Sequence, residues 1–236
     1  MLKKYRQIIW EFIRGDLATD EFEKWLYKAK ELEELVGGEF YLEIVSTDYQ
    51  SKSQIYELKQ NLREKLHLSD DLRCQCITLA NTAITDMGSD RDKAVFATFK
   101  TIRNFGEPLW WLSLYNCTIC RQFWLVAHEE NQNDINCLKR LTNDEGTQIA
   151  ESNKWPKHFR TYEELLIIGR DNGCSVTFVD PLNDSSLIYT AINLAKERPG
   201  ISVAAIASLL SLDHELAVEV CKRAVSEEKV NISFPE

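Results

Sequence analysis

Glycine and proline are scarce in this chain, with nine and five among 236 residues. Their scarcity excludes a long flexible linker and any low-complexity tract. The sequence also lacks a run of about 18 apolar residues, which argues against a membrane-spanning helix. Its opening segment, MLKKYR, is charged and has none of the apolar stretch that secretory signals contain. We therefore expect a cytoplasmic protein with no membrane partner.

Catalytic motifs are missing as well. There is no G-x-S-x-G, no P-loop, no G-x-G-x-x-G after a predicted strand and no HExxH. The chain has only four histidines, and none is close in sequence to a candidate nucleophile. The triplet His128-Glu129-Glu130 has no second histidine at helical spacing, so we favour a solvated turn at 128–134 over a hydrolytic or metal site. These absences predict that the protein is not an enzyme.

Acidic residues outnumber basic ones by 37 to 28, which gives a formal net charge of −9 and a pI near 5.1. A chain of this charge is a poor bulk partner for nucleic acid, and a basic protein suits it better. Hydrophobic residues make up 44%, as is ordinary for a globular protein. The seven cysteines are odd in number and unevenly spaced, so we expect reduced thiols and no disulfide framework.

Periodicity divides the chain into three predicted domains. Residues 1–68 carry apolar side chains at steps of three and four, with breaks at Gly15 and Gly37-Gly38, which predicts a helical bundle. Residues 69–182 combine helical segments with aromatic and β-branched runs, which predicts an α+β domain. Residues 183–236 contain short apolar segments at helical spacing, which predicts a third, helical domain. The predicted fold class is α+β, predominantly α, with a small central antiparallel sheet and flanking helices.

The middle domain centres on a predicted hairpin. Two apolar runs, 109–115 and 123–127, flank the only CxxC of the chain, Cys117 to Cys120. We expect a strand at 174–179 to join the same sheet. Upstream, helical spacing predicts two helices, one carrying Cys76, Leu79, Ala80, Ala83 and Met87 and the other Val95, Phe96, Phe99 and Ile102.

Four cysteines in two close pairs are candidate metal ligands. Cys74 and Cys76 form a CxC about forty residues before the CxxC of Cys117 and Cys120. Because each pair can bind a metal from a single turn, four thiolates suit a tetrahedral zinc ion, and we predict a structural zinc site. Alternatively, the CxC supplies small core residues at a helix start, or His128 is a ligand. A redox role is less favoured, because strand-like residues continue on both sides of the CxxC.

The last domain resembles a winged helix. Helical segments at 187–194 and 203–210, a third segment capped by Asp213, and a strand at 230–234 follow one another in the order of that fold. The third segment would be the recognition helix, but its acidic residues outnumber its basic ones. They are Glu215, Glu219, Glu227 and Glu228, against Lys222, Arg223 and Lys229. Base reading requires exposed cations and amides, so we favour a protein-binding or structural role over DNA binding.

A segment of the first domain also resembles a known family. In 12–49, a helix that ends in glycine precedes an EFE-x-W-x-Y motif and a YLE-x-x-S-x-D-Y motif. These motifs are filled by Glu21, Phe22, Glu23, Trp25, Tyr27, Tyr41, Leu42, Glu43, Ser46, Asp48 and Tyr49. The pattern resembles the short helical immunity proteins of the colicin-like kind, with which bacteria protect themselves. The resemblance implies a protein that neutralises a toxin by binding it.

Carboxylates along this segment are the candidate partner-binding groups. Between residues 11 and 48, eleven Asp and Glu stand against four Lys and Arg. Nuclease toxins need basic surfaces to hold phosphates, which an acidic inhibitor can cover. We select Asp20, Glu21, Glu23, Glu31, Glu34, Glu39, Glu43 and Asp48. A solvated acidic helix face would account for the same excess.

Two functions therefore follow from the sequence. The first is an immunity protein that binds a basic, nuclease-type toxin. The alternative is a winged-helix transcriptional regulator or adaptor with a structural or sensing zinc site. Binding to duplex DNA separates the two, because only the regulator requires it.

Overall fold

The structure is a computed structural model, and it describes residues 2–29, 31–68, 72–174 and 182–234. Contacts between Cα atoms divide the chain into two compact units, Met1–Thr82 and Ala83–Glu236. The division of the second part into domains 69–182 and 183–236 stays a prediction. None of the described helices is long and apolar enough to cross a membrane.

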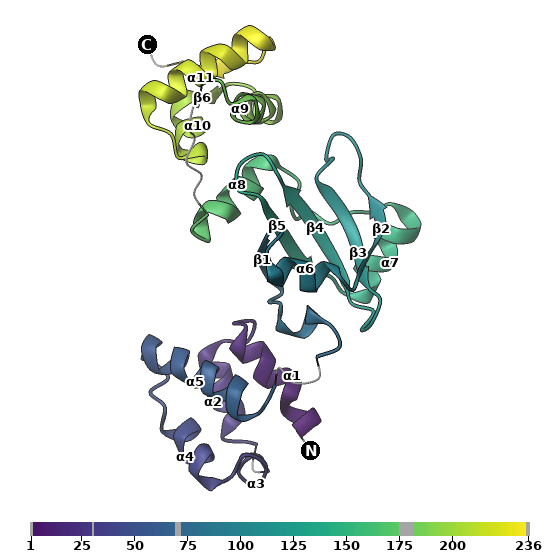
Figure 1. The fold of residues 1–236 in the computed structure, drawn as a ribbon, viewed down its shortest axis with the longest axis vertical. Coiled ribbons are helices and arrows are strands. Elements are labelled where there is room, and N and C mark those ends of the chain that lie inside the picture. Colours follow the sequence, from purple (N-terminus) through teal and green to yellow (C-terminus); the bar gives the residue numbers. More distant parts are fainter. Residues whose placement is uncertain (1, 30, 69–71, 175–181, 235–236) are drawn as a thin grey trace. The chain divides into compact units, whose positions relative to one another are not determined.

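The first unit is built from helices. They are α1 (Leu2–Ile13), α2 (Thr19–Leu26), α3 (Leu32–Val36), α4 (Gly38–Ser46), α5 (Lys52–Lys65) and the 3₁₀ helix η1 (Gln75–Thr78). Helix α1 contacts α2, α5 and η1 (Figure 1). The segment 40–45, which fits either a strand or a helix by pattern alone, lies within α4.

Aromatic packing forms the core of the first unit. The rings of Phe12 and Phe22 stack with their centroids 3.8 Å apart, and Trp10 beside them in the core is 1% exposed. The helices break where the sequence predicts. Gly15 and Gly37 have φ angles of 83° and 85°, in the left-handed region that glycine adopts without a steric cost. The helical periodicity of 1–68 therefore predicts this part of the fold correctly.

A five-stranded sheet is the framework of the second unit. Its strands are β1 (Thr82–Asp86), β2 (Phe99–Asn104), β3 (Leu112–Cys117), β4 (Phe123–Glu129) and β5 (Ile135–Arg140), in the spatial order β1-β5-β4-β3-β2. The pairs β2–β3, β3–β4 and β4–β5 are antiparallel. The predicted hairpin with the CxxC at its tip is β3–β4, which confirms the α+β fold class with a small antiparallel sheet.

The two faces of the sheet pack against different helices (Figure 1). Because side chains alternate along a strand, Leu125 and Val126 of β4 lie on opposite faces. The face of Leu125 packs against α7 (Asn143–Ser152) and α8 (Tyr162–Asp171), and the face of Val126 is covered by α6 (Asp90–Phe96).

The first of the two helices predicted upstream of the hairpin is wrong. Leu79, Ala83 and Met87 do not share a helix, because η1 ends at Thr78 and strand β1 follows. A spacing of four residues is also a multiple of the strand period of two, so it fits one face of a strand equally well. The segment forms a strand because β1 lies beside β5 in the sheet. The Met87 N–H extends this contact by donating to the Asp134 carbonyl at 2.7 Å.

The second predicted helix is correct only in its first half. Helix α6 ends at Phe96, whereas Phe99 and Ile102 belong to strand β2. Phe99 pairs with Cys117 of β3, and the ladder of backbone hydrogen bonds outweighs the helical spacing of the apolar side chains. The strand predicted at 174–179 lies, apart from Cys174, outside the described residues.

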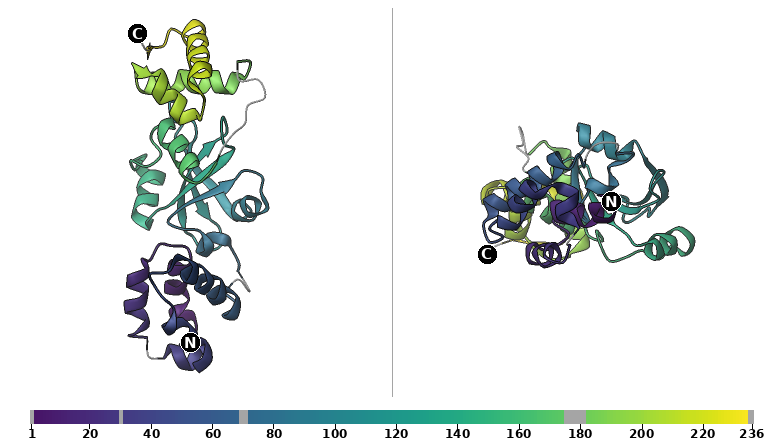
Figure 2. Two further views of the ribbon diagram at one scale, coloured as in Figure 1. Left: turned by 90° about the vertical axis from the view of Figure 1, so that its left-hand side faces the viewer. Right: turned by 90° about the horizontal axis from the view of Figure 1, so that it is seen from below.

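Three helices and two short strands complete the second unit. They are α9 (Ser185–Glu197), β6 (Ile201–Ser202), α10 (Val203–Leu210), α11 (His214–Glu227) and β7 (Ile232–Ser233). Helix α11 packs against both α9 and α10 (Figure 2). Asp213 caps α11 as predicted, accepting the Leu216 N–H at 2.8 Å. The strands β6 and β7 pair in parallel, and the likeness to a winged helix stays a prediction.

Helix α7 approaches the sheet closely at Gly146. The spacing of Thr142 and Glu145 in the sequence predicts a capping box at the start of this helix. The box is present, with the Thr142 hydroxyl accepting the Glu145 N–H at 3.2 Å and the Glu145 carboxylate accepting the Thr142 N–H at 2.8 Å. A Cβ atom at Gly146 would overlap the ring of Phe123 in β4 and lie 2.8 Å from its Cβ atom. A glycine is therefore needed for the helix to reach the sheet here.

Replacing Gly146 with alanine should destabilise the protein by about 1–3 kcal/mol, because overpacking outweighs the gain in helix propensity of roughly 1 kcal/mol. Gly38→Ala in α4 is the matched control, since its new Cβ atom would meet only a Glu33 side-chain oxygen at 3.8 Å. We expect that control to be neutral or slightly stabilising. Urea denaturation followed by circular dichroism compares the two variants. A Gly146→Ala protein as stable as the parent would contradict the close approach.

Candidate metal centre

Cys117 and Cys120 lie in the turn between β3 and β4. The N–H of Cys117 donates to the Gln122 carbonyl, and its carbonyl accepts the Arg121 N–H, both at 2.9 Å. Arg121 adopts a φ of 64°, and the Asn116 amide donates to its carbonyl at 2.8 Å. This tight turn brings the two thiols together, with Cys117 buried and Cys120 exposed.

Cys74 and Cys76 lie at the start of η1. Cys74 is the extended residue before the helix, with φ −153° and ψ 162°, and Cys76 is buried inside it. Two side chains of the first unit hold this segment in place. Arg14 donates to the Ile77 carbonyl at 2.7 Å, and Asp16, which is ion-paired with Arg14, accepts a backbone N–H just before β1 at 2.7 Å.

The four thiols form one group. The sulfur atoms of Cys74, Cys76, Cys117 and Cys120 all lie within 4.8 Å of one another. Thiolates that bind one tetrahedral ion at about 2.3 Å lie about 3.8 Å from each other. The observed spacing fits such an ion with only small side-chain movements. These four residues can therefore hold a metal ion, as the sequence predicts.

The Cys117 thiol differs chemically from the core thiols. Burial opposes its ionisation, but a hydrogen bond from the Cys120 backbone N–H and another with the Thr98 hydroxyl bring its pKa down to about 7. Burial raises the pKa of Cys137 to about 12 and that of Cys221 to about 11. Because metals bind the thiolate form, this contrast distinguishes a thiol that can bind a metal from thiols that only fill the core.

His128, the alternative ligand, takes part in a polar chain instead. Its Nδ1–H donates to the Asn136 amide oxygen at 2.6 Å, and its Nε2 accepts from the Tyr115 hydroxyl at 3.3 Å. This tautomer follows from Asn136, whose amide nitrogen donates to the buried Asp92 carboxylate at 2.8 Å. Asp92 also accepts from the Thr85 hydroxyl at 2.7 Å. The chain ties α6 to the sheet and occupies both ring nitrogens of His128.

The predicted turn between two strands is present, because β4 ends at Glu129 and β5 begins at Ile135, but Glu129 is not solvated, because its side chain is fully buried. The carboxylate accepts the backbone N–H groups of residues 131, 132 and 133 at 3.2, 2.9 and 2.6 Å. It also accepts the hydroxyl of Tyr162 in α8. Burial and the charge of Glu129 raise the pKa of Tyr162, so the phenol stays a donor. Gln132 then donates to the Thr190 hydroxyl of α9 at 2.9 Å.

The eight candidate partner-binding carboxylates differ in exposure. Glu23 and Glu43 are half-buried, and Glu43 is already bound by the Asn61 amide and the Lys65 ammonium group, which lowers its pKa. Asp20 forms an ion pair with Lys24 at 2.8 Å. The six exposed carboxylates are those of Asp20, Glu21, Glu31, Glu34, Glu39 and Asp48.

No family model matches this chain, and no curated protein or solved structure matches it. The resemblances to immunity proteins and to winged helices therefore stay predictions. The structure itself establishes a mixed α and β protein with a group of four thiols that can bind a metal ion.

Glu129→Gln should destabilise the protein by about 2–4 kcal/mol, because the amide nitrogen would face backbone donors in a buried site. Glu130→Gln is the matched control, since Glu130 is exposed and its loss of charge should change stability by no more than about 0.5 kcal/mol. Thermal and urea unfolding of both variants measure the difference. Equal stabilities would mean that the buried carboxylate does not hold the loop.

Proposed function

We propose that this protein is an immunity-type inhibitor, which neutralises a basic, nuclease-type toxin by binding it through the acidic surface of the first unit. The observation that supports this proposal is the exposure of six of the eight selected carboxylates in a segment where acidic residues outnumber basic ones by eleven to four. A surface of this charge attracts the Lys and Arg side chains with which a nuclease holds phosphates.

Exposed apolar side chains in the same unit add to this support. Tyr27 is 60% exposed, Leu42 64% and Tyr56 66%, although each is large enough to gain from burial. Tyrosines on a surface are typical anchors of protein interfaces, where a few buried side chains supply most of the binding free energy. Tyr27 and Leu42 also belong to the two motifs on which the family resemblance rests.

The intramolecular partners of the carboxylates indicate which of them are available. Glu43 is bound by Lys65 and Asn61 within the unit. The side-chain carboxylates of Glu34 and Glu39 have no hydrogen bond or ion pair with any residue that the structure describes. We therefore infer that Glu34 and Glu39 contribute more to partner binding than Glu43.

The local charges of α11 disfavour the alternative of a DNA-binding regulator. Lys222 pairs with Glu219 at 2.6 Å, and Arg223 pairs with Glu227 at 3.4 Å. Both cations within α11 therefore have an acidic neighbour that competes with a phosphate. A protein-binding or structural role of the C-terminal helices fits these pairs better.

We further propose that the four-cysteine group binds a structural zinc ion. Four thiolates in two closely spaced pairs are the ligand set typical of zinc sites that stabilise a fold, because every coordination position is filled by protein. Soft sulfur ligands also disfavour magnesium and calcium. Zinc bound in this way contributes its binding free energy to folding and leaves no open position for catalysis.

We predict that the adjoining gene encodes a basic toxin domain, and that expressing this protein together with that domain rescues growth and gives a salt-sensitive complex on purification. In the Glu34→Gln/Glu39→Gln variant the affinity should fall about tenfold, because each lost surface charge pair contributes up to about 1 kcal/mol. Titration calorimetry at low and high salt measures the change.

The matched control is Glu215→Gln/Glu219→Gln, which removes the same charge from α11 and should leave toxin affinity unchanged. Growth arrest despite abundant protein would refute the immunity function. A salt-sensitive shift of duplex DNA by the purified protein would instead support the regulator.

Elemental analysis should find about one zinc per chain, and Cys117→Ser/Cys120→Ser should lose it and melt about 5 °C or more below the parent. Cys174→Ser is the control, because Cys174 is outside the four-cysteine group and should keep the metal. If the parent is isolated without metal and melts unchanged after chelation, the four cysteines do not form a metal site.

A further inference from the structure

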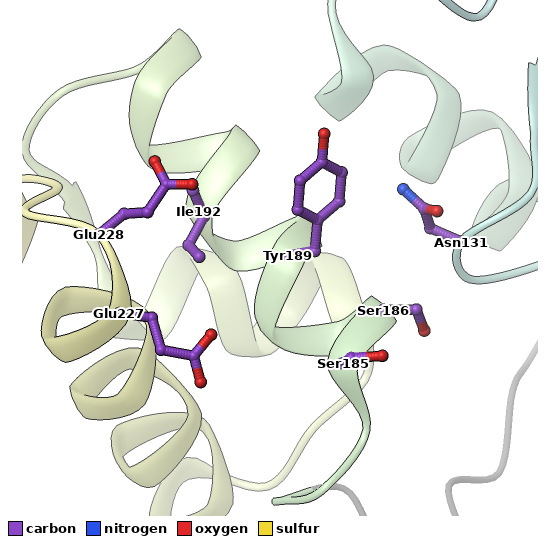
Figure 3. A pocket seen from close by; sticks show the side chains of 7 residues that line it. All are labelled: Asn131, Ser185, Ser186, Tyr189, Ile192, Glu227 and Glu228. Carbon is purple, nitrogen blue, oxygen red and sulfur yellow. The ribbon is translucent and has the colours of Figure 1, made fainter.

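A pocket of about 580 Å³ lies in the second unit, where α9, the end of α11 and the loop between β4 and β5 meet (Figure 3). Its volume is in the range of small-molecule sites. It is lined by Asn131, Ser185, Ser186, Tyr189, Ile192, Glu227 and Glu228. None of these residues belongs to the four-cysteine group or to the acidic surface of the first unit.

The walls of the pocket are held by buried polar bonds. The loop that carries Asn131 is fixed by the Glu129 carboxylate through three backbone N–H groups. From the same loop, the Gln132 amide donates to Thr190 of α9 at 2.9 Å, and both side chains are buried. The side of the pocket formed by this loop and α9 is therefore fixed before any ligand arrives, which lowers the entropic cost of binding.

The lining has an apolar side and a charged side. The Tyr189 ring is 46% exposed and stands over the pocket, with buried Ile192 on the same helix. The carboxylates of Glu227 and Glu228 lie on the other side of Tyr189 from Asn131 (Figure 3). A flexible apolar stem with a cationic head matches this combination, because the ring and the isoleucine take the stem and the carboxylates take the charge.

Each carboxylate already has one cationic neighbour and capacity for another. Glu227 pairs with Arg223 at 3.4 Å, and Glu228 pairs with Lys196 at 2.5 Å. All four side chains are 42–52% exposed, so these ion pairs are screened and weak. A carboxylate has two oxygens and accepts several hydrogen bonds, so a ligand cation can bind beside the existing one. Lys196 would then compete with the ligand for Glu228.

We propose that this pocket binds an organic cation, a primary ammonium or guanidinium group on an aliphatic stem. The head lies on the side of Glu227 and Glu228 and pairs with one of these two carboxylates, and the stem lies against Tyr189 and Ile192. The hydroxyl groups of Ser185 and Ser186 and the side-chain amide of Asn131 also line the pocket. They can form hydrogen bonds with a polar group at the other end of the ligand. The site is independent of the proposed toxin binding, because its residues lie on other elements.

The test is calorimetric titration of the full chain with agmatine, which carries both cationic groups on a four-carbon stem. We expect one site per chain, with no binding of the neutral 1,4-butanediol or the anionic succinate. A blocked tripeptide with a central arginine is the second arm. Tighter binding of the tripeptide identifies a peptide side chain as the source of the cation, and tighter binding of agmatine identifies a free amine.

The proposal predicts that some substitutions weaken agmatine binding and that one strengthens it. Glu227→Gln/Glu228→Gln should weaken agmatine binding at least about tenfold, and Tyr189→Leu several-fold, through the lost charges and the lost ring face. Lys196→Gln should tighten binding, because it removes the competing cation. Glu215→Gln, on the same helix α11 but outside the pocket, should bind as the parent does.

All of these side chains except Ile192 are at least partly exposed, so the variants should fold as judged by circular dichroism. No heat with agmatine or the tripeptide, equal binding of succinate, or weaker binding by Lys196→Gln would overturn the proposal. Failure here would leave the toxin experiment unaffected, since that experiment depends on the first unit.

Discussion

One buried carboxylate organises the second unit. Glu129 is the last residue of β4 and lies on the face that packs against α8. In place of water, its carboxylate accepts hydrogen bonds from three backbone N–H groups and from the Tyr162 phenol. A buried carboxylate is costly unless its oxygens are fully hydrogen-bonded, so the loop must adopt the geometry that supplies the donors. Through Gln132 the same loop reaches Thr190 of α9. Sheet, loop and helices thus share polar bonds inside one continuous apolar core.

The position of Glu129 could have been predicted, whereas its partners could not. Leu125, Ala127 and Glu129 follow one another at the strand period of two, which places the carboxylate on the same face as two buried side chains. That alternation contradicts a solvated turn at this residue. Tyr162, however, lies 33 positions away, and only the packing of α8 on the sheet brings its hydroxyl to the carboxylate.

Local signals predicted local structure well, and the failures have a common cause. The capping box at Thr142, the glycine breaks of the first unit and the hairpin around the CxxC depend on neighbours in sequence, and all are present. The segment 79–87 and β2 depend on backbone pairing with distant strands. Their apolar residues are spaced three or four positions apart, which is typical of a helix. Such a segment can still form a strand when a neighbouring strand supplies its backbone hydrogen bonds. The four cysteines were grouped correctly because ligand chemistry, and not the path of the intervening chain, suggested the pairing.

Net charge and local geometry have different roles in the two proposed binding sites. A charge of −9 repels polyanions and draws cationic partners from a distance, but salt at physiological concentration screens this effect beyond about 8 Å. Long-range attraction therefore raises encounter rates for any basic partner without choosing among them. Selection has to come from groups at contact distance. On the first unit these are the exposed side chains of Tyr27 and Tyr56, and the carboxylates of Glu34 and Glu39, which have no ion pair among the described residues. In the pocket they are Tyr189, on the helix that the Glu129 loop contacts through Gln132 and Thr190, and the carboxylates of Glu227 and Glu228 at the end of α11. Rigid walls favour a small cation of one shape, whereas an open acidic surface favours a large basic partner, so the same excess of acid can serve two distinct ligands.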